Sequence, residues 1–224
     1  MKLWPTMVRQ AGVEWRISLR RFGEVMNPLV FFLATVSLFP LGLSPEPDRM
    51  AGYATGVLWV ATLLAFLFAQ ARQFRAEAYN GVLEQLALSP HPLALLVVAK
   101  LVVQWVILTL PLLILAPVAA YALNFPVQGL STLLAALTLA TPTMLALGSV
   151  GAALTVHAHQ GGALLTVLVM PMLVPVLVFG ARATDLASAG SAPGGALLWL
   201  AMLAVLSVSL GPFVIAAALR QSLA

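Results

Sequence analysis

The sequence predicts an all-α integral membrane protein, and three observations lead to that fold class. Of the 224 residues, 62% are hydrophobic and 8% are charged, far from the usage of soluble globular domains. The mean hydropathy is +1.03. Between Arg49 and Arg182 only five residues carry a formal charge, and all five lie in one stretch from Arg72 to Lys100. Long uncharged apolar runs are typical of helices that cross a bilayer.

Residues 1–24 are predicted to form an amphipathic helix that lies in the membrane interface. At about 100° per residue, basic side chains share one face of a helix from Leu3 to Phe22, while tryptophans and other apolar residues share the other. We expect the arginines to meet lipid phosphates and the tryptophans to enter the membrane. The candidate anchors are Trp4, Arg9, Trp15, Arg16 and Arg20. A disordered basic leader is the alternative, and a cleavable signal peptide is not expected because no small-residue cleavage site follows.

Residues 25–224 are predicted to form one domain of six membrane spans, since a crossing helix needs about 20 mostly apolar residues. The long uncharged run from Leu101 to Ala181 is divided by turn-forming residues at Asn124–Gly129 and again at His157–Gly162. The predicted spans cover about residues 25–43, 52–71, 101–123, 130–156, 163–181 and 196–219. This order, an interfacial helix followed by six spans, resembles that of ABC export permeases.

The distribution of lysine and arginine predicts the orientation, because these charges resist translocation. Nine of the eleven basic residues fall in the N-terminal segment, the polar stretch between spans two and three, and the C-terminus. Only Arg49 and Arg182 fall on the other side. Both termini and the polar stretch are therefore predicted to be cytoplasmic. The loops Ser44–Ala51, Asn124–Gly129 and Arg182–Gly195 are predicted to face outward.

The polar stretch between spans two and three is predicted to hold a short amphipathic helix over about residues 74–88. On this helix Tyr79 lies with apolar residues on one side, while Glu77 and Glu84 share the opposite side. Gly81 in the middle costs about 1 kcal/mol relative to alanine, which indicates a close contact or a break between two short helical turns. An ordinary solvated loop is the alternative. We name residues 71–92 the polar loop.

Seven blocks in the same order together resemble the CcmB family. They are NPLVFF (Asn27–Phe32), LFPLGLSPEP (Leu38–Pro47), VLWVATLLAFL (Val57–Leu67), NGVLEQLALSPHPLALLVVAK (Asn80–Lys100), ATPTMLALGSVGAALT (Ala140–Thr155), GGALLTVLVMPMLVPVLVFG (Gly161–Gly180) and AAALR (Ala216–Arg220). The resemblance extends from the first span to the last few residues. It departs at Asn80, where the family usually has an acidic residue, at Gln104, where it has a histidine, and at a cytoplasmic turn around His157 and His159 that is usually basic.

The resemblance implies a role as the membrane subunit of the haem exporter of cytochrome c maturation, in the bacterial inner membrane. Implied partners are a cytoplasmic ABC ATPase, a second copy of the chain, a haem-handling membrane subunit with its small accessory subunit, and a periplasmic haem chaperone. Haem is the implied substrate, ATP is bound by the ATPase partner, and no cofactor is expected on this chain itself. Membrane lipid, rather than nucleic acid, is the expected partner of the basic N-terminus.

Energy coupling is predicted to occur at the polar loop, because the chain itself has no phosphate-binding motif. A P-loop needs a glycine-rich turn that ends in lysine, and the only lysines, Lys2 and Lys100, are not preceded by glycine. A separate subunit would then have to hydrolyse ATP. The resemblance implies that a coupling helix docks into that subunit through Glu77, Tyr79, Asn80, Gly81, Glu84 and Gln85.

Motifs for catalysis or metal binding are absent from the sequence. No H-E-x-x-H or G-x-S-x-G pattern occurs, and no cysteine is present. Ser149 is predicted to serve helix packing, and His157 and His159 are the weak candidates for haem ligation. Pro171 and Pro175, one turn apart in span five, form the candidate hinge. The pairs Gly52/Gly56 and Gly148/Ala152 are predicted to permit close helix approach.

Three alternatives remain open at this stage. The chain could be an ABC permease for a drug or a polysaccharide, which would share the topology. It could be a passive assembly scaffold, which would share the partners without needing a coupling helix. Within the haem-exporter prediction, ATP hydrolysis could move haem outward or release the haem-loaded chaperone.

Overall fold

The computed structural model describes residues 3–20, 22–43, 46–70, 74, 81, 92–156 and 161–223. Every regular element in this part of the chain is helical, which confirms the all-α prediction. The elements are α1 (Leu3–Arg20), α2 (Phe22–Gly42), α3 (Pro47–Gln70), α6 (Leu93–Ala122), the 3-10 helix η1 (Val127–Gly129), α7 (Leu130–Leu154), α8 (Gly161–Ser188) and α9 (Gly194–Leu223).

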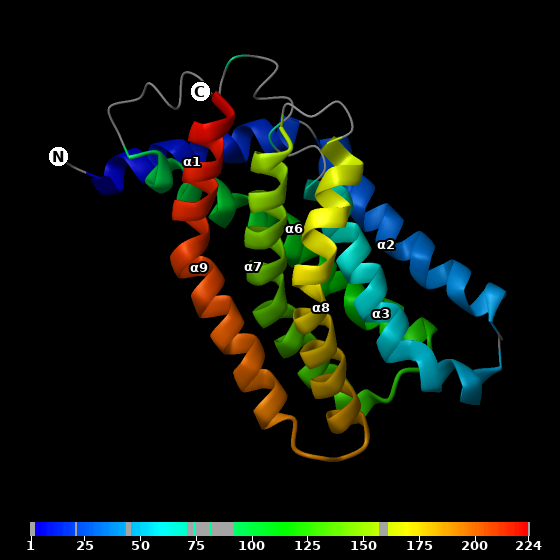
Figure 1. Ribbon diagram of the computed structural model, residues 1–224. Helices are drawn as coiled ribbons and strands as arrows, with labels where there is room; N and C mark the ends of the chain where they lie inside the picture. The colour runs from blue at the N-terminus through cyan, green and yellow to red at the C-terminus, as the bar shows by residue number, and fades with distance from the viewer. Residues whose placement is uncertain are drawn as a thin grey trace.

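Five of the described helices are long and apolar enough to cross a membrane. They occupy Arg49–Gln70, Leu93–Ala122, Val127–Leu154, Leu164–Ser188 and Gly194–Gln221, and α2 adds a shorter apolar stretch, Met26–Gly42. These helices alternate in direction, and both ends of the chain lie at the same end of the bundle (Figure 1). Helix α1 lies across this end, which we call the α1 end.

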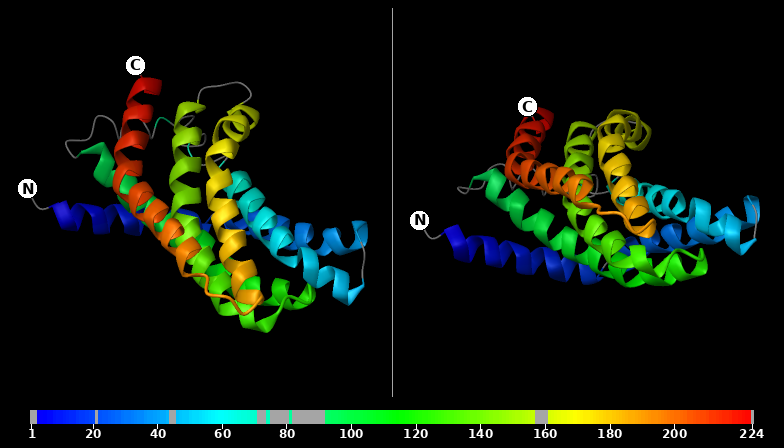
Figure 2. Two further views of the ribbon diagram at one scale, coloured as in Figure 1. Left: turned by 60° about the horizontal axis from the view of Figure 1, so that its bottom comes forward. Right: turned by 90° about the horizontal axis from the view of Figure 1, so that it is seen from below.

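Helix α7 is the centre of the bundle, since it packs against α3, α6, α8 and α9. Its buried positions are mostly small or β-branched, such as Ala136, Ala140 and Gly151, which lets the neighbours approach closely. Helices α2 and α3 pair on one flank, while α9 covers the other (Figure 2). Helix α1 runs beside α6. The polar loop connects the ends of α3 and α6 at the α1 end.

The break between α6 and α7 confirms the division predicted at Asn124. Asn124 has a φ of 51°, in the left-handed region that asparagine tolerates better than most residues. The Phe125 amide donates to the Ala120 carbonyl (2.9 Å), and the Asn124 amide donates to the Tyr121 carbonyl (3.1 Å). This pair of bonds is a Schellman helix end.

Helix α8 is longer than the sequence predicted, so the loop expected over Arg182–Gly195 is wrong in its first half. The predicted span ends before the first charged residue, Arg182. In the structure α8 continues to Ser188 and carries Arg182 on its exposed side. Packing extends it, because Ala183 and Thr184 are fully buried. The helix ends where Gly190 takes a φ of 73° and the Ser191 amide donates to the Leu186 carbonyl (2.8 Å).

Two other helices begin earlier than their predicted spans. Helix α3 starts at Pro47, within the loop predicted over Ser44–Ala51, and proline suits a first helical turn because its missing N–H has no partner there. Helix α6 starts at Leu93, eight residues before the predicted span at Leu101. The charge of Lys100 marked that predicted boundary, yet the lysine lies inside the helix.

Candidate functional site between α1 and the start of α6

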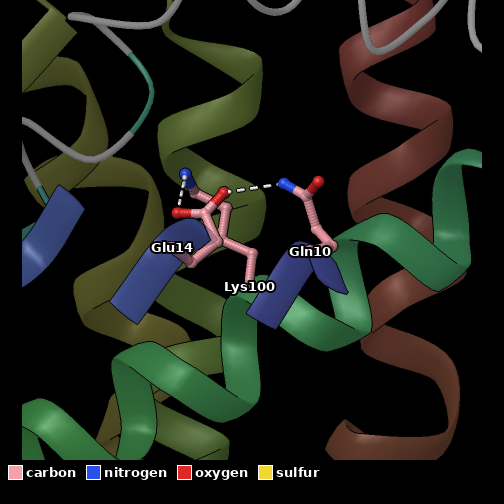
Figure 3. Close-up of polar contacts among 3 residues, drawn as sticks. All are labelled: Gln10, Glu14 and Lys100. Atoms are coloured by element: carbon pink, nitrogen blue, oxygen red, sulfur yellow. Dashed lines mark hydrogen bonds and ion pairs between the residues drawn. The ribbon is translucent and has the colours of Figure 1, made fainter. Parts of the chain in front are cut away.

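Among the charged side chains whose burial the structure describes, that of Lys100 is the most enclosed. It lies at the start of the third turn of α6, and its Nζ is 3.6 Å from Oε2 of Glu14 on α1. The two side chains are 11% and 12% exposed. Gln10, one turn earlier on α1, donates from Nε2 to the other carboxylate oxygen of Glu14 at 3.1 Å (Figure 3). The three side chains thus link α1 to α6 by polar contacts.

Phe74, in the polar loop, forms a third side of this site. Its ring is 2% exposed, and the Lys100 Nζ lies 5.5 Å from the ring centroid. A cation over an aromatic face is attracted by the ring quadrupole, by about 2 kcal/mol where water is excluded. Lys100 therefore contacts both α1 and the polar loop. We call Glu14, Lys100 and Phe74 the junction.

Pairing of the two charges in the junction offsets the free-energy cost of burying them. Moving an isolated ammonium or carboxylate out of water costs several kcal/mol, and the two ions offset this only when they stay together. Removing one partner of a buried pair costs about 3–5 kcal/mol, because the remaining charge stays buried and loses that attraction. The contact therefore fixes α1 against α6 more firmly than an exposed ion pair would.

Three sectors can be distinguished on the side-chain surface of α1. Met7, Gln10, Ala11, Glu14 and Ser18 are half-buried and form the sector that faces the bundle. Arg9 and Arg16 are exposed on the opposite side. Val8 and Trp15 lie between these two sectors and are 55% and 42% exposed. The prediction of a helix with one basic and one apolar face is thus incomplete. A third sector, which includes polar side chains, packs against the bundle.

Glu14 is the functional candidate that the sequence analysis missed. It is the only acidic residue in the 18 residues of α1. Lys100 is likewise the only charge in the apolar stretch from Leu93 to Ala181. Two lone opposite charges in apolar surroundings are a signal that could have predicted their pairing.

The polar loop does not contain the single continuous helix predicted over residues 74–88. Gly81 has a φ of 69°, which is left-handed, so a right-handed helix cannot continue through it. This corrects the prediction in favour of the break that glycine at this position had suggested. The other predicted coupling residues, Glu77, Tyr79, Asn80, Glu84 and Gln85, lie outside the described residues.

Substitution of Gly81 by alanine is expected to strain the polar loop, since an L-residue at this φ costs about 1–2 kcal/mol. Gly81→Asn should be tolerated better, because asparagine visits this region more readily. Amide hydrogen exchange in the loop should therefore be faster in the alanine variant than in the asparagine variant. Equal exchange in the two variants would contradict the left-handed turn. Gly195→Ala, on α9 with open space around it, is the control.

A second polar contact lies where α3 leads into the polar loop. Gln70, the last residue of α3, is 1% exposed and accepts a hydrogen bond from Oγ of Ser149 on α7 at 3.5 Å. A Cβ at Gly148 would lie 2.5 Å from Cγ of Gln70. The predicted packing role of Ser149 and the close approach at Gly148 are confirmed. Gly52 and Gly56, in contrast, are exposed and meet no atom within 4 Å.

Comparison with known proteins now identifies the family. The family model described as "CcmB protein" matches residues 6–222. The chain belongs to the CcmB family. Curated relatives named "Heme exporter protein B" include those of Pseudomonas aeruginosa, 44% identical over 93% of this chain and 94% of the relative, and of Haemophilus influenzae, 42% identical over 94% and 95%. The relative in Escherichia coli is 44% identical over 94% of this chain and 96% of its own length.

The remaining predicted residues of this CcmB family member are distributed over several places. Pro171 and Pro175 lie inside α8 and are exposed. Trp4 and Arg20 belong to α1. His157 and His159 fall outside the described residues. Within the described part of the chain, no group of three or more histidine, aspartate or glutamate side chains could hold a metal ion.

Proposed function

We propose that this chain is the membrane subunit of a haem exporter that serves cytochrome c maturation. The membership in the CcmB family carries the proposal, together with the printed name of its relatives, "Heme exporter protein B". The multi-pass arrangement of apolar helices supports it. Haem is the substrate under this proposal, and the chain acts as a transporter subunit rather than as an enzyme.

Six spans in the bacterial inner membrane, with both termini in the cytoplasm, form part of the proposal. Five described helices meet the length and hydropathy of a span. The sixth is α2, which is 21 residues long and corresponds to about 30 Å of helix at 1.5 Å per residue. The basic residues of α1 and the position of both termini at the α1 end support the orientation.

Coupling to ATP is proposed to pass through the polar loop. The loop starts one residue after the buried amide Gln70 and ends where α6 begins, so any displacement of it acts on both α3 and α6. Phe74 of the loop contacts Lys100, and Lys100 contacts Glu14. A cytoplasmic ABC ATPase that displaces the loop would therefore also transmit force to α1. The exposed prolines of α8, Pro171 and Pro175, are the proposed hinge.

Reversal of one loop charge tests the proposed ATPase contact. Glu84→Lys is expected to weaken association with the ATPase subunit and to lower its stimulation, because acidic side chains suit a basic docking groove. Association can be measured by co-purification and stimulation by phosphate release. Glu46→Lys, at the opposite end of the bundle, makes the same charge change away from the ATPase. Equal behaviour of the two variants would remove the coupling assignment.

The assembly is proposed to contain two copies of this chain, the ATPase, a haem-handling membrane subunit with its small accessory subunit, and a periplasmic haem chaperone. Reconstitution in vesicles, with and without the haem-handling subunit, separates the possible roles. Haem movement that depends on ATP and on this chain supports export. If chaperone release depends on ATP and no haem moves, the role of ATP is chaperone release and the export proposal is wrong.

The other two functional classes predict different phenotypes. Deletion of a haem-exporter subunit should abolish c-type cytochromes, whereas deletion of a drug or polysaccharide permease should change drug tolerance or surface glycan. A passive scaffold should tolerate Glu84→Lys. Staining for covalently bound haem in the deletion strain distinguishes these classes.

A further inference from the structure

An apolar pocket of about 230 Å³ lies between α6, α7 and α9. On α6 the pocket is lined by Val98, Leu101, Val102 and Trp105. These four residues share one side of the helix, and Lys100 lies on the other. The pocket is thus separate from the junction. Ser207 contributes the only hydroxyl group of its lining side chains, and the indole N–H of Trp105 already donates to Oγ1 of Thr141 at 3.0 Å.

The depth of the pocket along the helices places it in one half of the bundle. Val98 is the sixth residue of α6, and Trp105 follows seven residues later, or about 10 Å along the axis. Helix α6 starts at the α1 end, so the pocket lies in the half of the bundle nearest α1. In a membrane this half faces the acyl chains of a single leaflet.

The pocket opens onto the lipid-facing surface rather than onto water. Val102 on α6 and Val208 on α9 belong to its lining and are 54% and 59% exposed. Next to them on the outside of α9, Val205 is 67% exposed. The exposed side chains named at the mouth of the pocket are apolar, so the medium there in a membrane is hydrocarbon. Apolar cavities of this kind exclude water.

The packing around the pocket explains why side chains of the chain itself do not fill it. Helices α7 and α9 are in close contact beside it, where a Cβ at Gly211 would lie 3.1 Å from Cβ of Ala146. The next residue, Pro212, and Pro142 on the facing helix both line the pocket. Each proline removes a helix hydrogen bond, so the two helices are disturbed at the same level.

We propose that the pocket binds one acyl chain of a membrane phospholipid from the leaflet on the α1 side. Its volume exceeds that of a cavity of about 150 Å³ which takes benzene and falls below the roughly 300 Å³ at which sites for drug-sized molecules begin. A hydrocarbon chain fits these limits, whereas a haem macrocycle does not. The inference rests on the membrane location and does not depend on which substrate is exported.

Photo-crosslinking in proteoliposomes tests this site in the assembled complex. A phospholipid with a diazirine on its acyl chain is activated by light, and the modified peptides are identified by mass spectrometry. We expect adducts concentrated on the α6 segment around Val102 and on the α9 segment around Val208. Adducts spread evenly over the exposed faces of α8 and α9 would overturn the proposal.

A matched pair of substitutions separates the pocket from the general lipid surface. Ser207→Leu fills the pocket and should abolish the concentrated adducts, while Ser209→Leu, on the exposed side of the same helix, should leave them in place. Adducts that survive Ser207→Leu would contradict the pocket. Adducts seen with the isolated chain but lost in the complex would show that a protein partner covers it instead. The thermal midpoint of both variants in detergent establishes that they fold.

Discussion

Exchange of the two buried charges, Glu14→Lys together with Lys100→Glu, is expected to restore most of the stability that either single reversal removes. Each single reversal leaves two like charges facing one another in a site that is about nine-tenths buried, and breaking such a pair costs about 3–5 kcal/mol. The exchanged pair keeps the attraction between α1 and α6. Thermal unfolding of the purified protein in detergent measures the effect.

Restoration in this experiment should be incomplete for a reason that the geometry provides. In the exchanged protein a carboxylate replaces the ammonium beside the Phe74 ring, so the contact at 5.5 Å loses its attraction. That contact is worth about 2 kcal/mol where water is excluded. Glu14→Gln with Lys100→Met, which removes both charges, should come closer to the unmodified protein than either single reversal.

The exposed ion pair at the opposite end of the bundle is the control for the junction. Arg49 Nε lies 2.9 Å from Oε2 of Glu46, and the two side chains are 71% and 64% exposed. Exposed pairs contribute about 0.2–1 kcal/mol, so Glu46→Lys should change the midpoint little. If the exchanged junction is no more stable than the single reversals, the ion pair does not hold α1 in place.

The second large effect is expected at Gly180, where α8 meets the ring of Trp59 on α3. Trp59 is fully buried, and its Nε1 donates to Oγ1 of Thr184 at 3.1 Å. A Cβ at Gly180 would overlap the six-membered part of this ring. Gly180→Ala should therefore push the two helices apart or displace Trp59. Overpacking of this kind costs about 1–3 kcal/mol.

A matched glycine and a compensating change make this prediction specific. Gly56 lies on the same helix as Trp59 but meets no atom within 4 Å, so Gly56→Ala should leave the thermal midpoint unchanged or raise it. Trp59→Leu removes the ring that the new methyl group meets. The loss caused by Gly180→Ala should therefore be smaller in the Trp59→Leu background than in the unmodified protein. Equal losses in both backgrounds would show that the ring is not the obstacle.

The two glycine pairs of the sequence show why local patterns predict packing only in part. Both pairs have the same spacing, but Gly148 packs on Gln70 and Gly52 lies on the exposed surface. Gly180, which belongs to neither pair, makes the closer contact. The spacing of small residues predicts only that a helix has a small-residue face. It does not state whether a neighbouring helix lies against that face.

The candidate site divides in the same way between what was predictable and what was not. The polar loop and the basic helix were predictable, because both depend on charges within short segments. The junction was predictable only in part: two lone opposite charges could suggest that Glu14 and Lys100 pair, but the third member, Phe74, and the helices involved follow only from the fold. The coupling residues from Glu77 to Gln85, apart from Gly81, stay a prediction.

The sequence by itself determined the class of this protein, the order of its apolar helices and the turn at Asn124, because hydropathy, charge and backbone preference belong to individual residues and their near neighbours. Only the tertiary structure decided that Lys100 is enclosed with Glu14 and Phe74, that α8 continues past Arg182, and that a pocket opens between α6, α7 and α9. These features depend on distances between helices. Such distances follow from the packing of all the side chains together rather than from any one segment.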